Sequence, residues 1–422
     1  MKKTLVAVAA LSAAGIASAQ STLTVFGALD TGVSYYETSS KYQGLTTPAA
    51  PKPDLKQSQW ALSNSGNVSS RIGFRGQEDL GGGLAAAFWL ESTLWPDVGS
   101  IGRAGTYFDR RSTVSLLGPF GEVRMGRDYT PTFWNDAVFD PFGVVGAGTS
   151  LIAQTMGGSL PTISLNRGYY ARKANSVGYF LPANLGGFYG QAMYAFSENV
   201  SGPQLQDDPK AVNNSRTGGY AGARVGYANG PFDIALSYGK SNIGDNYHFG
   251  STTTVTTTNL GASYDFSLVK LFGEYSMIDV KTDFANAATF PLTPALTPPL
   301  NVDTRNFLVG LSIPIGAGQI KASYAQVKGQ FYNFTPYGPL PMTTPDPKAT
   351  KFALGYVYNL SKRTALYTNF AVTKNENGAA VGVVNVASAD VGPGYTNTVN
   401  SNAAGYRADR GYGYDVGIRH AF

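Results

Sequence analysis

The last eleven residues of the chain, 412–422, alternate strictly between two kinds of side chain. One face of the extended strand that they would form is mostly apolar or aromatic: Tyr412, Tyr414, Val416, Ile418, His420 and Phe422. The other face is small or polar: Gly413, Asp415, Gly417, Arg419 and Ala421. A period of two that runs to a terminal Phe is typical of a membrane β-strand between lipid and a polar lumen. Residues 23–36 alternate in the same way, so both ends of the chain predict a closed barrel.

The start of the chain predicts a removable secretory signal peptide over residues 1–19. Lys2 and Lys3 precede an apolar stretch, and Ala17 to Ala19 supply a small-residue cleavage site. The apolar stretch is too short for a membrane span. Removing 19 of the 422 residues leaves 403, and the loss of two lysines lowers the formal net charge from +5 to +3. A charge that small gives no reason to expect nucleic-acid binding.

Composition excludes two classes of membrane or secreted protein. No run of about 18 apolar residues is present after the signal, so helical membrane spans are not expected. The chain has no cysteine, which excludes disulfides and thiolate metal sites. Its 51 glycines, 26 tyrosines and 23 phenylalanines fit the tight turns and aromatic girdles of a transmembrane barrel.

Sixteen strand-like segments recur along residues 20–422, which we interpret as one all-β domain. They are 23–36, 70–77, 84–93, 111–117, 122–127, 175–181, 187–196, 219–227, 232–240, 255–264, 269–280, 306–315, 319–327, 350–358, 364–373 and 412–422. Short turns alternate with long loops, which include a polar stretch through Pro48, Pro51 and Pro53 and residues 291–300, 332–347 and 375–410. This alternation predicts a sixteen-stranded antiparallel barrel with short periplasmic turns, long extracellular loops and both termini at the periplasmic rim.

Residues 129–168 form about forty residues without a strand pattern. A compact domain rarely carries so long a loop unless the loop is functional or disordered. Phe133, Trp134, Phe139 and Phe142 make this one too apolar for a disordered segment. We therefore predict that it folds against the protein and narrows the lumen.

Several segments resemble the Gram-negative general porins of the neisserial, comamonad and Burkholderia type. They are 23–30 (LTVFGALD), 71–84 (RIGFRGQEDLGGGL), 120–127 (FGEVRMGR), 175–179 (NSVGY), 354–356 (LGY), 360–364 (LSKRT) and 416–422 (VGIRHAF). The matches span the mature chain, and only the long loops fail to match. The resemblance implies a homotrimer of sixteen-stranded barrels in the outer membrane, each with its third loop folded into the lumen.

The same resemblance implies partners but no cofactor and no metal. The barrel would contact outer-membrane lipid and lipopolysaccharide, and small anions and hydrophilic solutes would pass through it. Phe422 would be part of the signal that the barrel-insertion machinery reads. The alternative is that Phe422 is only a residue of the aromatic girdle.

Alternation along the strands places a set of arginines in the lumen. Because Ile72 and Phe74 are expected to face lipid, their neighbours in sequence face inward. The same argument on other strands gives the full set: Arg71, Arg75, Arg111, Arg124 and Arg172. In the comamonad-type porins that the chain resembles, arginines matching Arg71, Arg111 and Arg172 form the basic cluster at the constriction. The alternative is that these arginines pair with Glu91 or with loop carboxylates and only stiffen the wall.

Acidic residues give a less specific pattern. Glu91 is expected to point inward from its strand, and Asp136 and Asp140 lie in the predicted constriction loop. The two loop residues would set a transverse field against the arginines. Alternatively, Asp140 before Pro141 only starts a turn.

Enzymatic function is not expected from this sequence. The only histidines, His248 and His420, are predicted to lie far apart, so a shared metal or a Ser/His pair is not expected. A passive channel for small hydrophilic solutes that favours anions fits best. A channel for one particular solute, and a structural or adhesive surface barrel with a closed lumen, remain as alternatives.

Overall fold

A computed structural model describes residues 22–42, 53–103, 105–156, 170–199, 215–246, 251–284, 300–333, 346–384 and 406–422. The predicted signal peptide, the predicted loop at 291–300 and His248 fall largely or wholly outside these ranges. Within these ranges, no helix is both long and apolar enough to cross a membrane.

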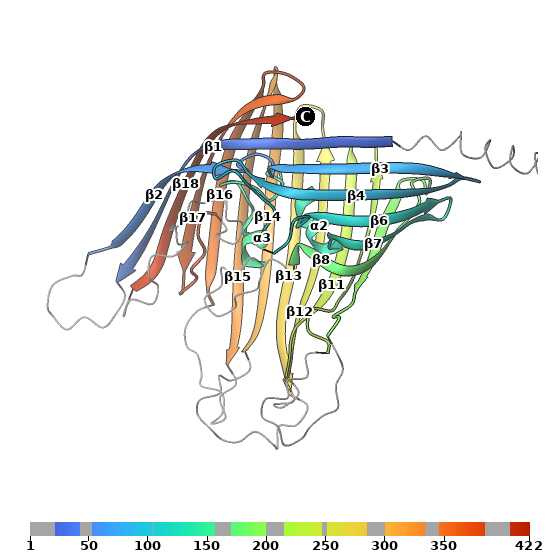
Figure 1. Ribbon diagram of the computed structural model, residues 1–422. Helices are drawn as coiled ribbons and strands as arrows, with labels where there is room; N and C mark the ends of the chain where they lie inside the picture. The colour runs from blue at the N-terminus through green and yellow to red at the C-terminus, as the bar shows by residue number, and fades with distance from the viewer. Residues whose placement is uncertain are drawn as a thin grey trace, which may run out of the picture.

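The described strands form one antiparallel sheet that closes on itself (Figure 1). They are β1 Thr22–Tyr42, β2 Leu55–Asn64, β3 Arg71–Gly81, β4 Leu84–Trp95, β5 Ser100–Ile101, β6 Arg111–Gly118, β7 Gly121–Tyr129, β8 Arg172–Phe180, β9 Phe188–Ala195, β10 Tyr220–Asn229, β11 Phe232–Asn246, β12 Ser251–Asp265, β13 Lys270–Phe284, β14 Leu300–Ile315, β15 Gly318–Asn333, β16 Lys348–Asn359, β17 Thr364–Glu376 and β18 Tyr406–Ala421. Consecutive strands pair, and β18 pairs with β1 from Ala28 opposite Ala421 to Tyr42 opposite Tyr406. This last pairing closes the barrel.

The eighteen described strands occupy sixteen positions in the barrel wall. β2 and β3 both pair with β1 and share one position, and β5 is a two-residue strand that pairs with β4 alone. The predicted sixteen-stranded barrel is therefore confirmed. The prediction of a polar loop before residue 70 is partly wrong, because β2 lies in that segment. Its side chains alternate between the two faces of the wall, with Trp60 and Leu62 exposed at 68% and 55% on the outer face. The other outward residues of β2 are polar.

The break between β2 and β3 folds toward the lumen around Asp30. The Asp30 carboxylate accepts hydrogen bonds from the backbone N–H of Asn67 at 2.8 Å and of Val68 at 2.6 Å. The Tyr367 hydroxyl donates a third at 2.6 Å. Ser65 adopts a φ of 63° at the start of the break. These contacts satisfy the backbone groups that the interrupted strand leaves without ladder partners.

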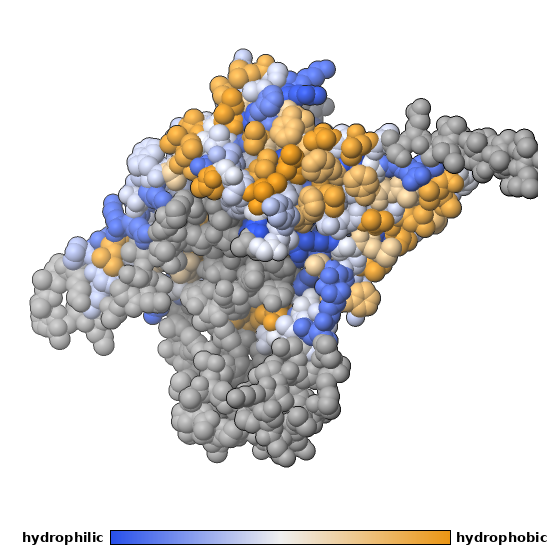
Figure 2. Space-filling view, viewed as in Figure 1, coloured by the Kyte–Doolittle hydropathy of each residue, from blue (hydrophilic) through white to orange (hydrophobic). Residues whose placement is uncertain are grey.

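The outer face of the wall is apolar, as the alternation predicts. On β1 the exposed side chains include Leu23, Val25, Leu29 and Val33, whereas Asp30 between them is fully buried on the inner side. Figure 2 shows hydrophobic residues gathered over the part of the surface where β1, β3 and β4 lie in Figure 1. On β18, Tyr414, Val416 and Ile418 are exposed, as is Phe422 directly after the strand, in agreement with the pattern at the C-terminus.

Residues 130–156 of the predicted constriction loop fold inside the barrel, between the strands that run across Figure 1 and those that run steeply. They contain two helices that the sequence pattern did not predict, α2 Pro131–Phe139 and α3 Leu151–Met156. Thr130 caps α2 by accepting from the backbone N–H of Phe133 at 3.3 Å. The prediction that this segment folds against protein is confirmed for residues 129–156; residues 157–168 lie outside the described ranges.

Three wall glycines make room for this loop. A Cβ at Gly261 of β12 would collide with the ring of Phe139, and one at Gly310 of β14 would lie 2.7 Å from Pro141. One at Gly355 of β16 would lie 2.8 Å from the Phe142 ring. The loop therefore packs close to the wall backbone on three alternate strands. Larger side chains at these positions would displace it.

The segment after β17 corrects a second expectation. Residues 375–410 were predicted as one long loop on the rim, but Ala379, Val381 and Val383 are buried inside the barrel. Val381 packs with α3 residues Leu151 and Ile152 in one apolar cluster. Strands β17 and β18 also reach further than the pattern indicates. The start of this loop supports the constriction loop from inside.

Candidate channel constriction

A cavity of about 640 Å³ lies between the wall and the constriction loop. Strands β3, β4 and β6–β8 supply most of its charged wall, and the loop supplies the opposite side. Seven basic side chains line it: Arg71, Arg75, Arg110, Arg111, Arg124, Arg172 and Lys321. Three carboxylates line it: Glu91, Asp128 and Asp140. The lining therefore carries a net charge of +4.

All five arginines that alternation placed in the lumen line this cavity. Their sequence neighbours behave accordingly, since Val114 on β6 and Met125 on β7 are 58% and 52% exposed on the outer face. Glu91 and Asp140 also line the cavity, whereas Asp136 does not. Composition and spacing thus located the charged wall, and the geometry below decides how its charges are compensated.

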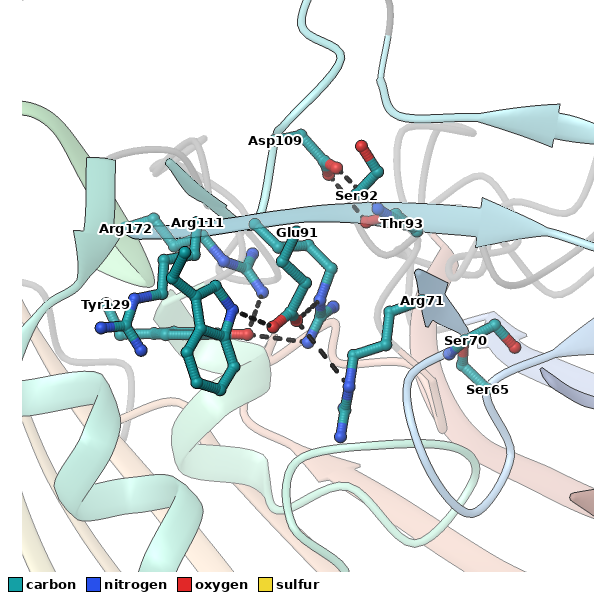
Figure 3. Close-up of polar contacts among 12 residues, drawn as sticks. Ser65, Ser70, Arg71, Glu91, Ser92, Thr93, Asp109, Arg111, Tyr129 and Arg172 are labelled. Carbon is teal, nitrogen blue, oxygen red and sulfur yellow. Dashed lines mark hydrogen bonds and ion pairs between the residues drawn. The ribbon is translucent and has the colours of Figure 1, made fainter. Parts of the chain in front are cut away.

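Glu91 contacts three side chains of the wall (Figure 3). Its Oε1 accepts from Nε of Arg110 at 2.5 Å, and Nε of Arg71 lies 3.8 Å from the same oxygen. The indole N–H of Trp89 donates to Oε2 at 3.0 Å. The Arg110 side chain is only 8% exposed, whereas that of Arg71 is 32% exposed. Glu91 therefore neutralises a buried arginine at short range and leaves Arg71 largely available to the lumen.

Asp128 serves two arginines in the same way. Its carboxylate lies 2.5 Å from Nη1 of Arg124 and 3.7 Å from Nε of Arg111. Glu122 adds a bond at 2.8 Å to Nε of Arg124. Arg124 is thus fully compensated, and Arg111 shares a distant partner. The wall-stiffening alternative describes Arg124 and Arg110 better than it describes Arg71 and Arg111.

Arg172 and Arg75 have no carboxylate partner of this kind. The Tyr129 hydroxyl accepts from Nη2 of Arg172 at 2.9 Å and from Nη2 of Arg110 at 2.7 Å (Figure 3). Within the described ranges Arg75 makes no ion pair and no hydrogen bond, and its guanidinium lies against the rings of Phe26 and Trp89. These two arginines account for much of the uncompensated positive charge.

The two loop carboxylates predicted to set a transverse field, Asp136 and Asp140, do not present free negative charge to the cavity. Asp140 is 3% exposed and accepts from the backbone N–H groups of Phe142, Val144 and Ser150 at 2.9, 3.0 and 3.2 Å. Burial raises the pKa of this carboxyl, and the backbone hydrogen bonds oppose the rise. The geometry favours the turn over the field for this residue.

The position of Asp136 contradicts the predicted transverse field more clearly than that of Asp140. Asp136 is fully buried on the wall side of α2, where it accepts a hydrogen bond from the side-chain amide of Asn259 and neighbours the buried Glu274 of β13. Burial raises its pKa to about 6. Asp136 lies on the face of the short helix α2 that packs against the wall, so its side chain points toward the wall. The sequence pattern of a segment predicted to be a loop gave no indication of this direction.

Sequence reasoning missed Arg110, Lys321 and Asp128. Arg110 immediately precedes β6, so strand alternation does not apply to it and its side chain turns inward. Lys321 shares the inward parity of Ser323 and Ala325 on β15, which are 6% and 2% exposed, so alternation was sufficient to find it. Asp128 follows a register shift between Gly126 and Asp128, where simple alternation stops.

Comparison with known proteins identifies the family. The model of the Gram-negative porin family matches residues 4–378. The chain belongs to this family. Outer membrane porin protein 32 of Delftia acidovorans is 35% identical over 432 residues, which cover all of both chains.

Solved structures agree with this assignment. The anion-selective porin from Comamonas acidovorans matches with a TM-score of 0.70 and 33% identity, over 96% of this chain and 100% of that one. OmpT of Vibrio cholerae in its trimer form matches with a TM-score of 0.56 and 16% identity, over 95% and 99%, which shows a shared fold. This porin is accordingly an outer-membrane channel for passive diffusion.

The remaining candidates for chemistry lie away from the cavity. His420 is exposed near the end of β18, with Nδ1 2.9 Å from the Thr364 hydroxyl. Across the described ranges, no three His, Cys, Asp or Glu side chains gather as a metal-binding group.

Proposed function

We propose that this porin favours anions over cations. The observation that carries the proposal is the net charge of +4 on the cavity lining, with Arg75 uncompensated and Arg71 and Arg111 only distantly paired. Arginine keeps its charge at any working pH. The anion selectivity named for the Comamonas porin agrees with this direction.

Charge acts strongly here because the lining surrounds the permeating ion. In a narrow, partly desolvated lumen, the field of fixed charges is screened less than at an open surface. Anions are attracted and cations of similar size are repelled. The preference should weaken as the salt concentration rises.

We also propose that the working unit is a homotrimer in contact with lipid and lipopolysaccharide. The support is membership of the porin family and the apolar outer wall. Phe422 is proposed as part of the assembly signal. Its backbone N–H and C=O exchange 3.1 Å hydrogen bonds with Gly27, and its ring covers the outer side of that glycine.

The test is the zero-current potential of the purified protein in a planar bilayer with a KCl gradient. An anion-favouring channel sets the potential toward the chloride equilibrium value, and the offset shrinks at higher salt. A potential on the potassium side would contradict the proposal. Absence of any conductance would instead favour the structural or adhesive alternative.

A further inference from the structure

Arginines and aromatic rings lie next to one another across six neighbouring strands of the cavity wall. We call this set the arginine–aromatic strip: Phe26 of β1, Arg75 of β3, Trp89 of β4, Arg111 of β6, Arg124 of β7 and Phe180 of β8. Every member lines the cavity. The ion-pair arrangement described above does not explain why each guanidinium lies against a ring.

The contacts in the strip are close and nearly continuous. Cζ of Arg75 lies 5.4 Å from the Phe26 ring centroid and 5.2 Å from that of Trp89. Trp89 also contacts Arg111, whose Cζ lies 4.4 Å from the Trp89 ring centroid. Cζ of Arg124 lies 3.9 Å from the ring centroid of Phe180. Phe26 and Trp89 also contact edge to face, with centroids 4.9 Å apart.

A second set of flat groups lies where β7 meets the constriction loop. The rings of Phe133 and Trp134 are both nearly parallel to Tyr129, at 9° and 5°, with centroid separations of 5.4 Å. Cζ of Arg172 lies 4.4 Å from the Tyr129 centroid. Trp134 is 41% exposed, so part of its surface is open to a permeating molecule. Flat groups are thus presented by the wall and by the loop.

We propose that this channel takes planar aromatic carboxylates, with benzoate as the simplest probe, in preference to saturated carboxylates of equal charge. The proposal rests on the proposed anion preference and names a substrate class for the same site. The carboxylate would accept from the guanidinium of Arg75, which contacts two rings but makes no ion pair and no hydrogen bond among the described residues. The ring would stack on the guanidinium planes and aromatic faces of the strip.

The physical reason lies in the geometry of a stacked guanidinium. A guanidinium that stacks on a ring keeps its edge N–H donors free for a carboxylate in its own plane. A flat anion gains both the edge hydrogen bonds and the face contact, whereas a saturated ring is too thick to stack in this way. Simple hydrophobicity predicts the opposite order, because cyclohexanecarboxylate is the more apolar of the two anions.

The experiment compares benzoate with cyclohexanecarboxylate as blockers of the chloride current through the purified protein in a planar bilayer at neutral pH. We expect benzoate to reach half-maximal block at a concentration about three- to tenfold lower, as expected for one or two stacking contacts. Phe26→Leu with Trp89→Leu should bring the two concentrations together. Trp89→Phe, which keeps a ring and loses the indole N–H, should retain the preference.

Phe352→Leu is the matched control, because Phe352 is 47% exposed on β16 and does not line the cavity. If the wild-type channel prefers chloride to potassium but both acids reach half-maximal block at the same concentration, the aromatic proposal fails and the anion proposal stands. If the wild-type channel prefers potassium, both fail. A benzoate preference that survives in the double Leu variant would also overturn the role of the strip.

Discussion

Replacing Arg71 and Arg111 together by Ser should weaken the anion preference. Both side chains line the cavity, and both lie nearly 4 Å from their carboxylate partners. Those partners stay compensated in the variant, since Glu91 retains Arg110 and Asp128 retains Arg124, each at 2.5 Å. The change therefore lowers the lining charge by two without leaving an unpaired buried carboxylate.

The magnitude follows from the size of the cavity. A volume of about 640 Å³ equals that of a sphere about 5 Å in radius, which sets the distance from a lining charge to an ion at the centre. In water with 0.1 M salt, one charge at that distance acts with about 0.5 kcal/mol. Two charges acting with opposite sign on chloride and potassium change their free-energy difference by about 2 kcal/mol, or about thirtyfold in permeability ratio. At 1 M salt the change falls to about threefold.

The assay is the reversal potential in KCl gradients at low and high salt. Arg305→Ser with Lys328→Ser is the control, because both residues are exposed, lie outside the cavity lining and pair with half-buried carboxylates at 2.9 and 3.1 Å. The control should keep the chloride preference. An unmoved reversal potential in the Arg71 and Arg111 variant would refute the reasoning and return these arginines to the role of wall-stiffening ion pairs.

Three other changes test how the loop and the strand ends are held. Phe139→Ala removes a fully buried ring that packs against Gly261, and should destabilise loop docking by about 3–5 kcal/mol. Single-channel current should then fluctuate more, and a current as steady as that of the wild-type channel would argue against the docking role. Deleting Phe422 should lower the amount of heat-modifiable trimer in the outer membrane, and unchanged yield would leave it as a girdle residue. Asp136 has a pKa raised to about 6 by burial, above its ordinary value, so docking is strongest at low pH and weakens as pH rises through about 6. Asp136→Asn should flatten the pH dependence of conductance, whereas an unchanged pH profile would assign that dependence to other groups, such as the neighbouring Glu274.

Much of the wall was predictable because β-strand periodicity leaves little freedom. A shift of one residue would move every arginine of a strand to the lipid face, where a charge is costly, so the pattern alone assigns Arg71, Arg75, Arg111 and Arg124. The barrel count was predictable for a similar reason. Each pair of alternating segments needs a short turn on one rim, and the Gly-rich turns are visible in the sequence.

Alternation is a poor guide where the backbone leaves the regular strand. Arg172 reaches the cavity although Asn175, with a φ of 55°, interrupts the alternation of β8 between it and Val177. Alternation across such an irregularity does not by itself explain the position of Arg172. The direction of Asp136 depends on how α2 docks, which is decided by contacts with β12 and β13 more than a hundred residues away.

Burial distinguishes the two interpretations for the two arginines that share Glu91. A buried charge needs a close partner, because an unpaired one carries a large desolvation penalty. Arg110, at 8% side-chain exposure, accordingly holds the short bond to Glu91, whereas Arg71, at 32%, is left with a 3.8 Å contact to the same carboxylate. Burial is not the only factor, because the side chains of Arg111 and Arg124 are 15% and 14% exposed but only Arg124 lies 2.5 Å from Asp128. Wall stability and the proposed anion preference would therefore arise from one arrangement, in which Glu91 and Asp128 each hold one arginine closely and a second one at nearly 4 Å.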